Sequence, residues 1–131
     1  MVDALEHARR ILVPHGVLVD ARPDSRVLAR VRAGTARGRV IGTIGTQRLT
    51  KDDDRLSDRA VRQVLTRGLF RSRRRGRFWQ AFSFEDVGEL RDYLNDHLRF
   101  SRRVRWRVPV AKRRGPVFVD RAIRFEILER T

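Results

Sequence analysis

Arginine occurs in almost every apolar segment of this chain, and this limits how those segments can be buried. Lys51 and Lys112 are the only lysines among 31 basic residues, which outnumber 16 acidic residues and give a net charge of +15. A guanidinium group is costly to bury unless it is paired. Since 40% of the 131 residues are hydrophobic, we expect a single domain, residues 1–131, with a folded core and a basic surface.

The first twenty residues predict a helix, a turn and a strand. Residues 3–13 carry apolar side chains at helical spacing, which gives them one apolar stripe. The sequence Pro14-His15-Gly16 then ends the helix. Val17–Val19 is a short continuous apolar run, which is typical of a strand covered on both faces. This order corresponds to the second half of a βαβ unit.

The middle of the chain predicts a hairpin and a second helix. Residues 26–32 alternate between apolar and basic side chains, and after a turn at Gly34–Gly38 residues 40–44 resume an extended segment. Thr50 begins a helix with acidic residues in its first turn, and an apolar stripe continues to Gly68. Residues 71–77 are so rich in arginine that we expect a basic turn there.

The last third of the chain predicts three strands and a third helix. Residues 78–84 are extended, and Ser83, with Asp86 three residues later, resembles a capping box for a helix whose apolar face ends at Leu98. Residues 104–108 alternate up to Pro109 as an edge strand, and residues 117–128 form the final strand. The strands after the first are therefore expected to be mostly antiparallel.

Residues 7–20 form the most recognisable motif of the chain, with the sequence HARRILVPHGVLVD. The motif resembles the stretch A-x-R-V-L-x-P-G-G-x-L before the fifth strand of class I S-adenosylmethionine-dependent methyltransferases, with His15 in place of a glycine. Residues 54–70, 82–94 and 121–130 follow in an order similar to the C-terminal, substrate-side half of small methyltransferase-like proteins. The resemblance implies a partial Rossmann-like α/β (α+β-like) fold, with one buried strand, mostly antiparallel strands after it and about three helices.

The resemblance covers only the part of that family's fold that follows the methyl donor. The family holds S-adenosylmethionine on a Gly-rich loop after its first strand, and the glycines at positions 34, 38, 42 and 45 are spaced along a hairpin instead. We therefore expect no cofactor and no independent catalysis for the isolated chain. The resemblance places Asp20 and Arg22 on the substrate side. The alternative, which the residues alone favour, is a solvated strand end where Pro23 turns the chain.

Basic residues interleaved with aromatic ones suggest a second function, the binding of nucleic acid. Arginines can neutralise phosphates while aromatic rings stack on bases. The alternative is that the rings pack against the sheet and the arginines are a solvated face. The candidate residues are Arg73, Arg74, Arg75, Arg77, Trp79, Arg103, Arg105 and Trp106.

A third possibility is an interaction subunit whose sheet is completed by another chain. The edge of the Val17–Val19 strand would then pair with a second copy of the chain or with a missing N-terminal half. The chain has no cysteine, its three histidines are scattered, and no apolar run approaches a membrane span. These features predict no disulfide, no metal site, no membrane partner and a cytoplasmic location.

Overall fold

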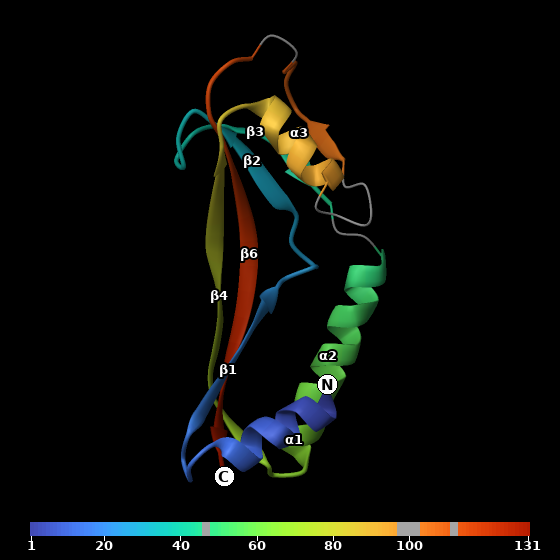
Figure 1. The fold of residues 1–131 in the computed structure, drawn as a ribbon, viewed down its shortest axis with the longest axis vertical. Coiled ribbons are helices and arrows are strands. Elements are labelled where there is room, and N and C mark those ends of the chain that lie inside the picture. The colour runs from blue at the N-terminus through green and yellow to red at the C-terminus, as the bar shows by residue number, and fades with distance from the viewer. Residues whose placement is uncertain (46–47, 97–102, 111–112) are drawn as a thin grey trace. The chain divides into compact units, whose positions relative to one another are not determined.

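The computed structural model describes residues 1–45, 48–96, 103–110 and 113–131, and these residues form two compact units (Figure 1). The first unit contains Met1–Asp24, Leu49–Phe78 and Ile123–Thr131. The second unit contains Ser25–Arg48 and Trp79–Ala122. The chain therefore passes from one unit to the other several times.

Within the described residues the fold is mixed α/β, with three helices and a six-stranded antiparallel sheet. The strand order is β1-β6-β2-β3-β5, and β4 also pairs with β6. A Rossmann-like arrangement is not confirmed, because it requires parallel neighbours and every strand here runs antiparallel to the next. In sequence order the elements are α1 Val2–Ile11, β1 Val17–Pro23, β2 Ala29–Ala33, β3 Val40–Ile44, α2 Arg48–Thr66, β4 Phe70–Phe84, α3 Val87–Asp96, β5 Val104–Trp106 and β6 Val117–Arg130.

The core of the first unit lies between its two helices and its strands. The predicted apolar stripes of α1 and α2 are confirmed in part: Leu5 from one and Val64 from the other are buried together with Leu128 of β6. Ile11 and Leu56, which belong to the same predicted stripes, are exposed. Helix α2 begins two residues before the predicted Thr50. The rest of this buried cluster is Ala60, Val61 and Phe70.

Strand β1 is present, but the prediction that it is covered on both faces is wrong. Val17 and Val19 are 54% and 56% exposed, while Leu18 between them packs against the core of the first unit. The strand therefore has one covered and one open face, as is common in antiparallel sheets. The turn before it forms as expected, and His15 adopts a positive φ of 62° there, in the region that normally favours glycine.

The second unit contains the predicted hairpin, now seen as β2 and β3, and the third helix, α3. Its core includes Val31 and Ile41 from the hairpin and Leu90 from the helix. The N-cap of α3 is Asp86, whose Oδ1 accepts a hydrogen bond from the backbone N–H of Glu89 at 2.8 Å, so the predicted capping box at Ser83 lies three residues too early. Leu98, predicted on the apolar face of this helix, lies outside the described residues.

Strand β4 corrects the prediction of a basic turn at residues 71–77. The strand runs without interruption from Phe70 to Phe84 and pairs with β6 (Figure 1). Its only residue without a side chain is Gly76, where an added Cβ would lie 3.0 Å from the ring of Phe125 on β6. Arginines dominate this segment, so the apolar alternation that marks a strand is hidden, and pairing with β6 decides the structure.

Gly42 lets β5 approach β3 closely and provides a test of the second unit. A Cβ at Gly42 would lie 2.9 Å from Val104 Cγ1 and 3.0 Å from Trp106 Cε3. We expect Gly42→Ala to lower the free energy of unfolding by about 1 to 3 kcal/mol, because the strand pair must move apart. Urea unfolding followed by tryptophan fluorescence measures this.

Gly45→Ala is the matched control for that substitution. The nearest atom to a Cβ at Gly45 is Leu28 Cδ2, at an ordinary contact distance of 3.9 Å. An equal loss of stability in both variants would contradict the close approach of β5 at Gly42.

Candidate functional site

The most exposed regular element of the first unit is the part of β4 from Arg71 to Phe78, hereafter the arginine strand. Every residue in it is exposed to solvent. At about 3.3 Å per residue, the seven residues from Arg71 to Arg77 span roughly 20 Å. Its five guanidinium groups belong to Arg71, Arg73, Arg74, Arg75 and Arg77.

Two carboxylates compensate part of this charge. Glu129 on β6 bonds Arg71 at 3.2 Å and Arg73 at 3.0 Å, and buried Asp24 accepts two hydrogen bonds from Arg77, at 3.0 and 2.6 Å. Within the described part of the chain, Arg74 and Arg75 have no carboxylate partner. Five guanidinium groups and two carboxylates leave the arginine strand with a net charge of +3.

Glu129 is the carboxylate that bonds the arginines at the N-terminal end of the arginine strand. The carboxylate also bonds His15 Nδ1 at 3.1 Å, and the glutamate is buried although His15 is exposed. The hydrogen bond from His15 is the largest cause that lowers the pKa of Glu129 below its ordinary value of 4.5; Arg71 and Arg73 lower the pKa further, while burial acts against them. Glu129 therefore remains ionised and anchors two arginines.

The lowered pKa of Glu129 predicts a pH dependence of stability. Because its pKa is lower in the folded state, ionised Glu129 stabilises the fold above pH 4.5, and this contribution falls as pH decreases through the folded pKa. We expect the free energy of unfolding of Glu129→Gln to change less with pH below 4.5 than that of the wild type. Urea unfolding at a series of pH values measures this difference.

Glu126→Gln serves as the control for that pH series. Glu126 lies on the same strand, and no hydrogen bond or ion pair of its carboxylate is found within the described residues. If both variants show the same pH dependence, the contacts of Glu129 do not stabilise the ionised carboxylate.

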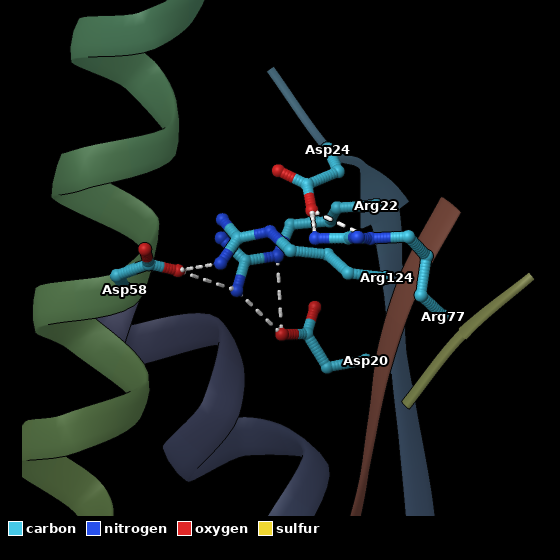
Figure 2. A network of polar contacts seen from close by, with 6 residues as sticks. All are labelled: Asp20, Arg22, Asp24, Asp58, Arg77 and Arg124. Carbon is cyan, nitrogen blue, oxygen red and sulfur yellow. Dashed lines mark hydrogen bonds and ion pairs between the residues drawn. The ribbon is translucent and has the colours of Figure 1, made fainter. Parts of the chain in front are cut away.

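A second polar cluster lies between β1, α2 and β6 and contains both residues predicted on the substrate side. Arg22 donates to Asp20 Oδ2 from Nε at 3.1 Å and from Nη2 at 2.8 Å, and its Nη2 also bonds Asp58 on α2 at 3.2 Å. Arg124 on β6 bonds the same Asp58 oxygen at 2.6 Å. Figure 2 shows both guanidinium groups directed toward Asp58.

This cluster is electrically balanced, with two arginines and two aspartates. The Arg22 and Asp20 side chains are only 19% and 12% exposed, so the structure brings the two predicted residues together and uses their charges to join secondary-structure elements. Arg22 Nη1 and Arg124 Nε are buried without a hydrogen-bond acceptor within the described residues. A substrate role for Asp20 and Arg22 stays a prediction.

Substitution of Arg22 tests the structural role of the balanced cluster. Arg22→Ala leaves the largely buried carboxylate of Asp20 without its two charged donors, so we expect the free energy of unfolding to fall by about 2 to 3 kcal/mol. Arg55→Ala is the control, because Arg55 is 78% exposed and lies 3.5 Å from Asp52; its cost should stay within about 0.5 kcal/mol. Urea unfolding compares the two, and equal costs would contradict the structural role.

The remaining nucleic-acid candidates lie in the second unit. Trp79 is 40% exposed, and the guanidinium carbon of Arg30 lies 3.9 Å from its ring centroid, a cation–π geometry. Arg103 and Arg105 are exposed. Trp106 is half-buried and packs against the core of the second unit, so its position agrees with a sheet-packing role.

Sequence reasoning missed Asp24, Asp58 and Glu129, the carboxylates that organise these arginines. Asp24 and Glu129 are buried acids, and an acid inside a basic or apolar segment was the only signal that could have indicated them. Asp58 occupies one position of an otherwise solvated helix face, where the sequence carries no such signal.

Comparisons with protein-family models, with curated proteins and with solved structures found no match to this chain. The resemblance to methyltransferases therefore stays a prediction. No helix in the described ranges combines the length and apolar character needed to cross a membrane.

Proposed function

We propose that this chain binds nucleic acid, and that the arginine strand is its contact surface. The observation that carries the proposal is an exposed strand with five arginines against two carboxylates. Such a strand attracts a polyanion by releasing its counterions. Arg71, Arg73 and Arg77 are held in place by Glu129 and Asp24, so part of the surface is ordered before a ligand binds, which lowers the entropic cost of binding.

Exposed aromatic rings favour a nucleic acid over other polyanions. Phe78 ends the arginine strand and is 47% exposed, and Trp79 is the next residue of β4. Aromatic rings that accompany basic residues stack on unpaired bases, which a sulfated polysaccharide does not offer. The proposed ligand is therefore nucleic acid with accessible bases.

The two arginines without carboxylate partners provide the test. We expect Arg74→Gln/Arg75→Gln to weaken binding to a fluorescein-labelled single-stranded oligonucleotide and to reduce the slope of log affinity against log salt by about 1.4, since each phosphate contact on a single strand contributes roughly 0.7. Fluorescence anisotropy at several salt concentrations measures both quantities.

Arg59→Gln/Arg62→Gln makes the same change in net charge on the exposed surface of α2. This control should keep the wild-type salt slope. If both double variants lose affinity equally, the chain attracts polyanions only through its overall charge and the arginine strand is not the site.

Replacement of Trp79 separates base stacking from charge. We expect Trp79→Ala to weaken binding to the oligonucleotide by about 5- to 150-fold, the equivalent of roughly 1 to 3 kcal/mol per stacked base, and to leave binding to heparin unchanged. Equal losses for both ligands, or no loss for either, would contradict recognition of bases by this ring.

A further inference from the structure

Strand β1 has an outer edge whose backbone groups have no strand partner within the described residues. The backbone N–H of Arg130 donates to the carbonyl oxygen of Gly16 at 2.8 Å. In an antiparallel pair, residues that bond the neighbour alternate with residues that point away from it. The register with β6 therefore directs the N–H and C=O groups of Val17, Val19 and Ala21 to the outer edge, where no further strand is found.

The side chains along this edge are apolar on the open face of β1. Val17, Val19 and Ala21 are all exposed. The charged residues of the strand, Asp20 and Arg22, belong to the opposite face and neutralise each other. The edge thus carries unpaired backbone groups, apolar side chains and no net charge.

The other strand of the first unit that has an outer edge is β4, and its chemistry is different. Natural proteins protect an edge from pairing by placing charged side chains on it, and the arginine strand has five. Like charges on two such strands would repel each other. Edge-to-edge association of this unit is therefore directed to β1.

We propose that two copies of this chain associate through β1, as antiparallel neighbours related by a two-fold axis at Val19. In this register Val19 lies opposite its own copy, and Val17 lies opposite Ala21 of the second copy. These are the residues with outward backbone groups, so each opposed pair exchanges two hydrogen bonds and the interface contains about six. On the open face apolar side chains meet apolar side chains, and no charge faces a like charge, because Asp20 on the opposite face lies across from Leu18 of the second copy.

A second copy fits this edge because the contact is self-complementary and closed. An isologous two-fold contact uses the same patch on both subunits and leaves no free copy of that patch. Association through β1 therefore ends at a dimer.

Dimerisation and nucleic-acid binding should respond to salt concentration in opposite directions. Two chains with a net charge of +15 each repel one another, and added salt screens that repulsion. We therefore expect dimerisation to strengthen with salt, whereas affinity for an oligonucleotide weakens. The two inferences can therefore succeed or fail independently.

Sedimentation equilibrium of the full chain, without nucleic acid, tests the proposal. We expect the mean mass to rise from one chain to two as protein concentration increases toward about 1 mM, and to rise at lower concentration in higher salt. A mass that stays at one chain, or larger species without a limiting dimer, would overturn the proposal.

Val19→Lys places two ammonium groups against each other at the two-fold axis and should abolish the dimer. Val17→Lys is a second variant at the same edge, with the same expected loss. Both positions are exposed, so circular dichroism should show a folded chain. Leu56→Lys adds the same charge at an exposed apolar position of α2 and should dimerise like the wild type. Loss of the dimer in all three variants would contradict the β1 interface.

Discussion

Backbone hydrogen bonding along β6 is the constraint on which the rest of this structure depends. The strand pairs with β1 through Ile123–Glu129 and with β2 through Val117–Asp120, and it also pairs with β4. Residues of β6 contribute to the core of each unit, as Leu128 does in the first and Val119 in the second. The charged clusters also depend on β6. Glu129 and Arg124 lie on this strand, and Arg77 lies on β4, which pairs with it.

The positions of the carboxylates determine which arginines form ion pairs within the fold and which have no acidic partner. Arg22, Arg32 and Arg124 bond aspartates and are mostly buried. Arg71 and Arg73 share a single glutamate, and Arg74 and Arg75 bond no acid within the described residues. A buried ion pair must be matched with good geometry because its desolvation is costly, whereas an exposed arginine needs no such partner. Part of the surplus charge therefore lies on an exposed strand.

The elements with a clear apolar period, the hairpin and the mostly antiparallel direction of the strands were predicted from sequence, whereas the long-range pairing with β6 and the charge clusters were not. The stripes that bury Leu5 and Val64 follow the helical period, and the hairpin follows simple alternation. The arginine strand was mistaken for a turn, because its side chains carry no apolar alternation and its structure comes from β6, about fifty residues later. The exposure of Val17 and Val19 to solvent likewise depends on the order of the strands in the sheet, which a local apolar run does not encode.

Local sequence also could not indicate how candidate site residues are used. Asp20 and Arg22 were singled out together and do lie together, but their neighbour Asp58 comes from a helix distant in the chain. Trp79 and Trp106 have the same kind of basic neighbours in sequence, yet one is exposed beside Arg30 and the other packs against a core. Burial, which distinguishes them, is a property of the assembled sheet.

Gly76, which faces the ring of Phe125, separates the arginines of β4 into two stretches that differ in how fully carboxylates neutralise them. The aromatic ring occupies the space where a side chain at position 76 would begin, so no cation can be added there without displacing it. On one side Arg77 is matched by Asp24, and on the other Arg71 and Arg73 share Glu129, while Arg74 and Arg75 bond no acid within the described residues. A polymer lying along this strand would meet uncompensated charge from Arg71 to Arg75 and a neutralised pair at Arg77, which gives an otherwise repetitive basic sequence a direction.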